Sequence, residues 1–459
     1  MVNKIVQSSE LIVDRKKVKM CVIKHLVCLG FFIINCQLLT VNYLYGYSFL
    51  GVDNYGDPVS GYTARSIGMG STDITAANDS AALASNPAAL LNVTAKKLVL
   101  SVSPVYNVFE ERANVANINM EYTKLKLNDM GAASYLYYGS SEYFNRIIAG
   151  IHFHPMTDLS YQYSNKEYSD VPALVSVENL DSSGGINELD FGVGAEIIKE
   201  VYFGLTYGVL SGENSLKDNY TTYTNNGTTD QIYVFDATRK FEGSCMRYGL
   251  VLTEWDYSLG MFYQPQASLT AKTSGTNSKY NVTVANAWST SDLASEKEIN
   301  LPEKFGFGFS YRFKDKYRTL FAADFVQQNW NAFTSATTSV AGVATGNKKQ
   351  HTTGYDGTKE IKIGFQHWLN DWIPVRYGFR YQQFYQTWDN NVNNFYYGVN
   401  ILKKEVPTFS CISLGSGYVL GYFDFDFGYE FGRRNYTDIS SERYDEYLQK
   451  FALTARYRW

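Results

Sequence analysis

Residues 421–432 read Gly-Tyr-Phe-Asp-Phe-Asp-Phe-Gly-Tyr-Glu-Phe-Gly, a strict alternation of aromatic with polar or bare side chains. Because successive residues of a strand point to opposite faces, one face of this segment is apolar and the other is polar. The same alternation recurs in residues 201–209, 305–313 and 375–381, and the chain ends in another such strand at Trp459. Repeated strands of this kind are typical of a transmembrane β-barrel with an apolar outside and a polar inside.

The composition is compatible with many membrane-spanning strands. The chain carries 38 Tyr and 28 Phe, which favour strands and membrane–water interfaces, and its 36 Gly against 9 Pro suit strands joined by tight turns. A mean hydropathy of -0.25 is expected when a lipid-facing surface is averaged with a wet lumen and loops. The net charge of -4 provides no basic surface for nucleic acid, so no nucleic-acid partner is expected.

The N-terminus has the pattern of an export signal. Five basic residues between Arg15 and Lys24 precede an apolar run from Leu26 to about Leu44, and small residues follow at Gly46 and Ser48. We therefore predict a signal peptide at 1–48, with a membrane anchor as the alternative. No later stretch approaches the ~20 apolar residues that a membrane helix needs. The expected location is the bacterial outer membrane, spanned many times by strands.

Fourteen strands are predicted, at residues 97–109, 130–139, 143–154, 187–199, 200–211, 243–255, 256–271, 303–313, 317–331, 358–369, 373–386, 408–420, 421–432 and 447–459. Short turns alternate with long loops, predicted at 155–186, 212–242, 272–300, 332–357, 387–407 and 433–446. Outer-membrane barrels have short periplasmic turns and long extracellular loops, so both ends of the barrel domain (96–459) are expected in the periplasm. Residues 110–129 leave open an additional strand or a long first loop.

Residues 49–95 do not alternate like barrel strands. They are rich in small residues and contain a helix start at Asp79-Ser80 and a stop at Pro87. A barrel of fourteen strands encloses a lumen too wide for wall side chains to fill. We therefore predict that this segment is an N-terminal plug, or hatch, with short helices. A periplasmic tail outside the barrel is the alternative.

The stretches ARSIGMG (64–70) and AANDSAALASNPAAL (76–90) resemble the hatch of the FadL/TodX family of outer-membrane transporters. Segments 184–197, 261–266, 301–313, 321–330 and 447–459 match in the same order. The resemblance implies an all-β fold, a fourteen-stranded antiparallel barrel closed by the hatch, and passive transport of long-chain fatty acids or aromatic hydrocarbons. Its hatch and gating positions would be Gly68, Gly70, Asn86, Pro87 and Ala88. The family's inward kink in the third strand would fall on Gly150 and Pro155.

Two further sets of residues are candidates for function. The loops 212–242 and 272–300 would form an entrance for substrate, with aromatic candidates Tyr220, Tyr223, Tyr233, Phe235 and Trp288, although such rings also pack loops. Charges expected to face the lumen are Arg312, Asp324, Arg376, Arg380, Asp424, Asp426, Glu430, Arg456 and Arg458. We expect opposite charges on neighbouring strands to pair and to dock the hatch. The alternative is that one arginine binds a fatty carboxylate.

Nothing in the sequence indicates catalysis or a cofactor. His152 and His154 share one strand face and form no triad; as a lone pair they are weak evidence for a metal, and no metal is expected. Cys245 and Cys411 are expected to be free, buried thiols. The expected partners are outer-membrane lipid and lipopolysaccharide, a hydrophobic small molecule, and the barrel-assembly machinery through the C-terminal strand. Alternative functions are a structural or secretion-associated barrel, a general porin, or a phospholipase-type enzyme.

Overall fold

The computed structural model describes residues 51, 55–93, 98–113, 118–139, 143–168, 174–223, 229–281, 287–345, 350–351, 354–394, 399–437 and 443–459. The predicted signal peptide, residues 1–48, lies outside the described residues, and so do parts of several predicted loops. None of the helices in the described ranges is long and apolar enough to cross a membrane.

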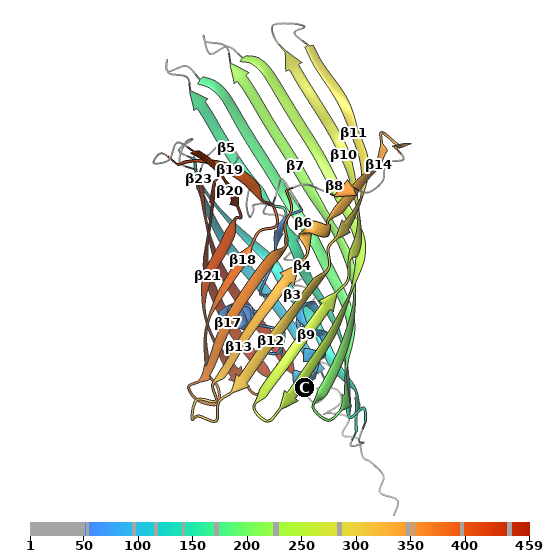
Figure 1. Cartoon of the computed structure of the whole chain (residues 1–459), viewed down its shortest axis with the longest axis vertical. Coiled ribbons are helices and arrows are strands. Elements are labelled where there is room, and N and C mark those ends of the chain that lie inside the picture. Colours follow the sequence, from blue (N-terminus) through green and yellow to red (C-terminus); the bar gives the residue numbers. More distant parts are fainter. Residues whose placement is uncertain are drawn as a thin grey trace, which may run out of the picture. The chain divides into compact units, whose positions relative to one another are not determined.

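Fourteen antiparallel strands close into a barrel, as predicted, because the last strand pairs with the first: Val99 lies opposite Arg458 (Figure 1). In order around the wall the strands are β2 (Leu98–Ala113), β3 (Ile118–Tyr138), β4 (Arg146–Asp158), β6 (Leu174–Ile198), β7 (Val201–Tyr223), β8 (Thr229–Glu254), β9 (Tyr257–Gln264) continued by β10 (Ala267–Asn281), β11 (Ala287–Leu301) continued by β12 (Lys304–Arg312), β13 (Leu320–Gln328), β17 (Thr358–Trp368), β18 (Pro374–Gln383), β21 (Thr408–Leu420), β22 (Phe423–Thr437) and β23 (Arg443–Arg458). Closure gives each wall strand a neighbour on both sides, so the backbone groups of the wall pair within the barrel, which a lipid environment requires.

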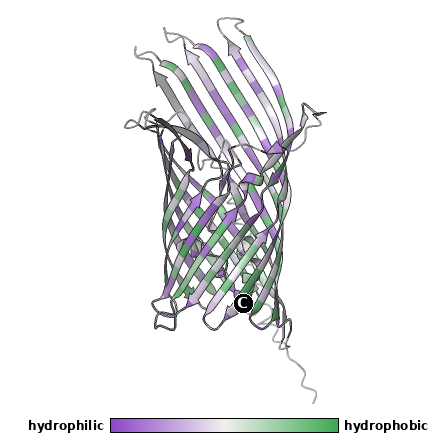
Figure 2. Ribbon diagram, viewed as in Figure 1, coloured by the Kyte–Doolittle hydropathy of each residue, from purple (hydrophilic) through white to green (hydrophobic). Residues whose placement is uncertain are grey.

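The alternation in the sequence sets the two faces of the wall. On β22, Phe423, Phe425 and Phe427 are 40%, 48% and 43% exposed, whereas Asp424 and Asp426 between them are buried. Hydrophobic and hydrophilic residues alternate along the wall strands in the same way (Figure 2). The aromatic side chains therefore face lipid and the carboxylates face the lumen, which agrees with the prediction.

Short connections gather at one end of the barrel. Gly421-Tyr422 joins β21 to β22, with Gly421 at φ 60° as tight turns require. Lys199-Glu200 joins β6 to β7, and Trp255-Asp256 joins β8 to β9. The C-terminus lies at this end (Figure 1). With its short turns at one end and its long strands at the other, the barrel has the architecture of an outer-membrane protein.

Five of the six predicted loops are largely strand, which corrects the sequence interpretation: 387–407 holds a separate hairpin, and 433–446 holds the end of β22 and the start of β23. Residues 155–186, 212–242 and 272–300 contain much of β6, the outer parts of β7 and β8, and most of β10 and β11. These strands stay in register, with Tyr220 opposite Tyr233 and Tyr280 opposite Trp288. They project beyond the rest of the wall (Figure 1). The described residues within 110–129, which are 110–113 and 118–129, continue β2 and β3 and form no additional strand.

The remaining elements are short. Before the wall come β1 (Asp57–Pro58), α3 (Ala64–Gly68), α4 (Ala82–Ser85) and the 3-10 helix η1 (Pro87–Asn92). β5 (Tyr161–Tyr168) pairs with β6, and β14 (Thr334–Val340) pairs with β11. The other short elements follow the strands that they adjoin in the sequence. They are η2 (Trp330–Ala332), β15 (Val343–Ala344), β16 (Gln350–His351) and a separate hairpin of β19 (Trp388–Asn394) and β20 (Val399–Glu405).

Candidate functional site

Residues 55–93, here called the plug, are almost entirely buried and pack against wall strands all around the barrel. Figure 1 shows the short helices of the plug, α3, α4 and η1, as blue coils inside the barrel. α3 begins at Thr63, whose hydroxyl accepts a hydrogen bond from the Ser66 backbone N–H at 3.2 Å. α3 contacts β18, β21, β22 and β23, whereas η1 contacts β4, β6, β7 and β8 on the other side. The plug therefore spans the lumen.

The plug backbone packs directly against glycines on the inner face of the wall. Gly68 of α3 lies against Gly415, where a Cβ on either residue would stand 2.9 Å from the other residue's Cα. Gly70 has φ 65°, and a Cβ there would meet the backbones of Ile363 and Phe379 at 2.8 Å. Gly428 is covered by the carbonyl of Ala64. The bare positions of the alternating strands are thus required for close approach of the plug.

Replacing Gly428 with alanine is expected to displace the plug from the wall, because the added methyl group would collide with the Ala64 carbonyl. Overpacking of this kind costs about 1–3 kcal/mol, and it should raise the ion conductance of the barrel in planar bilayers. The matched control is G357A, where the nearest neighbour of an added Cβ is 3.6 Å away. Equal conductance for both variants would show that the packing of Ala64 against Gly428 does not hold the plug in place.

The Asn86-Pro87-Ala88 sequence joins the plug to the wall. The Asn86 side chain accepts from the Ala88 backbone N–H at 3.2 Å and so caps η1, with Pro87 in the first turn. Its amide donates to the Ile74 carbonyl at 2.9 Å and to the Leu250 carbonyl of β8 at 3.2 Å. Pro87 and Ala88 rest on the inner face at Gly204. One buried amide therefore connects two plug segments and one wall strand.

Buried ion pairs line the inner wall beneath the plug. Arg376 and Arg456 reach Asp426 at 2.7 and 3.0 Å, and Arg380 reaches Glu430 at 2.7 Å. Arg456 also donates to Asn78 of the plug at 2.7 Å and lies 3.5 Å from Asp79. These arginines are therefore engaged by carboxylates that fix the wall and hold the plug.

The other charged candidates lie in different surroundings. Asp324 accepts from the backbone N–H groups of Asp73 and Ile74 at 2.7 and 3.0 Å, so it anchors a plug loop rather than pairing with an arginine. Arg458 is only partly buried and pairs with Asp424 at 2.6 Å. Arg312 does not lie in the buried lumen, because it is exposed at the end of β12, where the short turn begins.

Burial also perturbs charged groups of the plug itself. Arg65 donates to the Ala76 carbonyl at 2.7 Å, and burial, reinforced by Arg376 and Arg456, lowers its pKa to about 10. Burial raises the pKa of Asp73, although a hydrogen bond from Ser66 opposes the shift. The plug therefore carries buried charged groups that are hydrogen-bonded within the plug itself.

The β3–β4 seam is the one place in the described wall where we find that a strand of the plug replaces a wall neighbour. The ladder between β3 and β4 ends at Met130 and Phe153. Beyond it, β4 still pairs with β6, but its other edge pairs with β1, with Asp57 opposite Asp158. Within the described residues, β3 continues to Ile118 and pairs there with β2 alone. The plug thus takes the place of β3 beside the end of β4.

Ion pairs bridge this seam. Lys124 and Lys126 of β3 reach Asp158 of β4 at 3.3 and 3.0 Å. Pro155 lies where the β4–β6 register shifts, since a proline donates no ladder hydrogen bond. Gly150 lies within the continuous ladder, opposite Ala133 and Gly192. Of the two predicted kink positions, Pro155 lies at the register shift and Gly150 lies before it.

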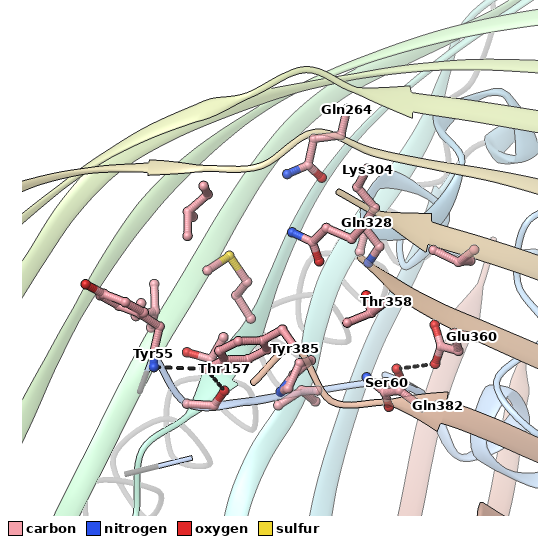
Figure 3. Close-up of a pocket in the computed structure, with 18 of the residues that line it drawn as sticks. Tyr55, Ser60, Thr157, Gln264, Lys304, Gln328, Thr358, Glu360, Gln382 and Tyr385 are labelled. Carbon is pink, nitrogen blue, oxygen red and sulfur yellow. Dashed lines mark hydrogen bonds between the residues drawn. The ribbon is translucent and has the colours of Figure 1, made fainter. Parts of the chain in front are cut away.

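A cavity of about 90 Å³ lies between the plug and the projecting half of the barrel (Figure 3). Its apolar lining is Tyr55, Val59, Met156, Ile186, Leu301, Val326, Trp330 and Tyr385, and its polar lining includes Glu188, Arg247, Gln264, Lys304 and Glu360. Two of these lining residues, Trp330 and Tyr385, stack with their ring centroids 3.9 Å apart, and the Tyr385 hydroxyl donates to the Gly56 carbonyl at 3.1 Å. Apolar side chains therefore converge beside the plug.

Lys304 is a cavity residue that the sequence did not single out. Its side chain enters the cavity (Figure 3), and among the described residues it makes no ion pair within 4 Å. It sits at the start of β12 on the same strand face as Gly306, so the alternation, extended by one residue, would have placed it toward the lumen. The unpaired cation that faces the cavity is thus a lysine rather than one of the predicted arginines.

The predicted entrance aromatics lie on the projecting strands. Tyr220 and Tyr233 pair across β7 and β8 with ring centroids 6.1 Å apart, and Trp288 is exposed on β11. Tyr223 ends β7. Phe235 lines a second cavity, of about 530 Å³, with Arg239 and Leu293. Of the five, Phe235 lines one of these two cavities and the other four line neither, so the set does not form one site.

A family model described as BamG matches residues 19–441. The chain belongs to the BamG family. No curated protein matches this BamG-family chain.

Solved structures of outer-membrane channels have the same fold as this BamG-family chain. The Pseudomonas putida toluene transporter TodX is 14% identical, with a TM-score of 0.56 over 88% of this chain and 100% of that one. A Pseudomonas aeruginosa FadL homologue is 12% identical, with a TM-score of 0.59 over 88% and 99%. The Ralstonia pickettii toluene transporter TbuX is 15% identical, with a TM-score of 0.54 over 87% and 99%. The resemblance to the FadL/TodX fold is confirmed.

Proposed function

We propose that the protein is a passive outer-membrane route for hydrophobic small molecules, such as long-chain fatty acids or aromatic hydrocarbons. The observation that carries this proposal is the convergence of buried apolar side chains beside the plug, among them Leu159, Ile186, Phe241, Leu301 and Trp330. A wet pore for ions needs no such cluster, whereas a ligand pocket is mostly apolar with a few polar groups. The solved structures that share the fold carry the names of channels and transporters.

The size of the cavity supports a gated route. Ligand pockets usually enclose roughly 300–1,000 Å³, whereas this one encloses about 90 Å³. A substrate therefore has to displace side chains or the plug. We take residues 49–95 as the moving hatch and Gly68, Gly70 and Asn86-Pro87-Ala88 as its contacts with the wall. The seam between β3 and β4 supports a sideways exit into lipid, because beyond Met130 and Phe153 it is closed by side-chain ion pairs and the two-residue β1 instead of a β3–β4 ladder.

Lys304 is expected to distinguish fatty acids from neutral hydrocarbons. Its ammonium group faces the cavity, and a charge-assisted hydrogen bond to a carboxylate contributes about 1.5–3 kcal/mol. K304Q should raise the concentration of oleate needed for half-maximal uptake about tenfold or more and leave toluene uptake unchanged. The control is K359Q, an exposed lysine at the same level of the wall. Equal effects of K304Q on both compounds would contradict carboxylate recognition here.

The proposal is tested by uptake of labelled oleate and toluene in cells with and without the gene. Faster uptake with the protein, and no increase in leakage of small ions, is the expected result. A rise in ion leakage with no selectivity for apolar compounds would indicate a general porin instead.

The family description favours a second candidate, a barrel that serves outer-membrane assembly without transport. The projecting strands β6, β7, β8, β10 and β11 would give such a protein a partner surface, and the C-terminal strand would contact the barrel-assembly machinery. In the same pair of strains, equal uptake with reduced levels of other outer-membrane proteins would favour this candidate. Unchanged protein levels with reduced uptake would favour transport. Both candidates place the protein among outer-membrane lipid and lipopolysaccharide.

A further inference from the structure

A fully buried cluster of nitrogen and oxygen ligands lies on the inner wall below the β3–β4 seam. His152 and His154 project from β4 with their rings 4.8 Å apart, and Asp190 projects from β6. All three side chains are buried. The Tyr62 ring of the plug lies 4.3 Å from the His154 ring and shields the cluster on that side.

Each imidazole has hydrogen-bond acceptors on both sides. His152 Nε2 is 2.6 Å from the Asp129 carboxylate, and His154 Nδ1 is 3.2 Å from the Pro155 carbonyl. These partners can only accept while Asp129 is ionised, so those nitrogens carry the ring hydrogens. In the neutral form of each ring, the opposite nitrogens, His152 Nδ1 and His154 Nε2, then present lone pairs to the Asp190 carboxylate at 3.7 and 3.2 Å. Three acceptors converge with no hydrogen between them.

Two observations indicate that a cation belongs at this point. Within the described residues, His152 Nδ1 and Asp190 Oδ1 are buried without a hydrogen-bond partner. The local charges do not balance either: three carboxylates, those of Asp129, Glu188 and Asp190, lie beside the two imidazoles, and the guanidinium that pairs with them, that of Arg247, is 3.2 Å from Glu188 and 3.8 Å from Asp190. Buried carboxylates in excess of cations are costly unless a further positive charge joins them.

We propose that His152, His154 and Asp190 bind a divalent transition-metal ion, with Zn²⁺ as the best fit. Ligand atoms around tetrahedral zinc stand about 3.3 Å apart, given bonds of about 2.0–2.1 Å. The separations of 3.2 and 3.7 Å are close to this spacing, and all three ligand atoms lie within 4.8 Å of one another, so an ion would draw the two imidazoles slightly together. Glu188 Oε2 lies 3.5 Å from His154 Nε2 and supplies a fourth ligand. Asp129 and the Pro155 carbonyl hold the remote ring nitrogens, as outer-shell groups do in zinc sites.

The position of the ion gives it a structural consequence. It would join β4 to β6 immediately before β4 separates from β3, directly under Tyr62 of the plug. The ion would therefore hold β4 against β6 at the point where the β3–β4 ladder ends, whatever the barrel transports.

The test uses full-length protein purified in detergent with an affinity tag that contains no histidine. After chelator treatment, Zn²⁺ is titrated and bound metal is counted by mass spectrometry. One Zn²⁺ per chain is expected, with affinity lost in H152Q/H154Q and lowered about 10–100-fold in D129N. The matched control is H351Q/H367Q, which removes the other two histidines after residue 48 and should bind like the parent.

A second measurement does not depend on the folding of any variant. Co²⁺ added to the unmodified protein should give the intense visible absorption of a tetrahedral site, and Zn²⁺ should abolish it. The proposal is overturned if the folded parent binds no Zn²⁺ at neutral pH, which would mean that protons supply the missing charge. It is equally overturned if H152Q/H154Q binds as tightly as the parent.

Discussion

Oxidising an S80C/S101C variant is expected to reduce uptake of toluene and oleate to the level of cells that lack the protein. Ser80 belongs to the plug and Ser101 to β2, and their buried hydroxyl oxygens lie 3.2 Å apart. Two cysteines at these positions can approach the short separation that a disulfide requires. The bond would fasten the plug to the wall, so a substrate too large for the 90 Å³ cavity could no longer displace it.

Reduction of the disulfide should restore uptake within the same cells, which separates locking from misfolding. The control is S278C/T290C, a cross-strand pair with its oxygens 3.0 Å apart on β10 and β11, where no plug residue is involved. Cys245 and Cys411 are free and buried, as predicted from the sequence. Undiminished uptake by the oxidised S80C/S101C protein would show that the plug need not move away from β2.

Replacing Asp426 with alanine is expected to give the largest loss of stability. Its carboxylate accepts from Arg376 at 2.7 Å and from Arg456 at 3.0 Å, and all three side chains are buried. Removing one member of a buried ion pair costs about 3–5 kcal/mol, because the remaining charges are left without compensation. The free energy of unfolding, measured by urea titration of the reconstituted protein, should fall by about this amount.

D371A is the matched control for this measurement. Asp371 pairs with Arg318 at 3.1 Å, but both side chains are largely exposed at a short turn. Exposed pairs contribute little because water and salt screen them. If D426A unfolds at the same urea concentration as D371A, the buried charges do not hold the wall and the plug together.

The wall was predictable because lipid on one side and the lumen on the other impose a period of two on every spanning strand. Phe423, Asp424 and Phe425 show this directly. The projecting halves of β7, β8, β10 and β11 were mistaken for loops because polar residues suffice there and the alternation fades. Their pairing depends on neighbours such as Tyr233 opposite Tyr220, which spacing along one strand does not reveal.

The site was only partly predictable. The inward direction of Asp426 and Arg376 follows from alternation, but their shared contact depends on which strands become neighbours. The replacement of β3 by β1 beside β4 joins residues about 100 positions apart, and the β4–β6 register shift at Pro155 leaves no signal beyond the proline itself. The sequence showed His152 and His154 only as a pair on one strand, because their partners Asp129 and Asp190 come from other strands.

The most direct measurement is photocrosslinking of the protein in cells with a diazirine analogue of oleate, followed by mapping of the labelled residues. We expect label on cavity residues such as Met156, Val326 and Tyr385, in addition to the lipid-facing Phe425. Label confined to Phe425 and other lipid-facing positions, with none in the cavity, would contradict the account that apolar molecules pass through the lumen beside the plug.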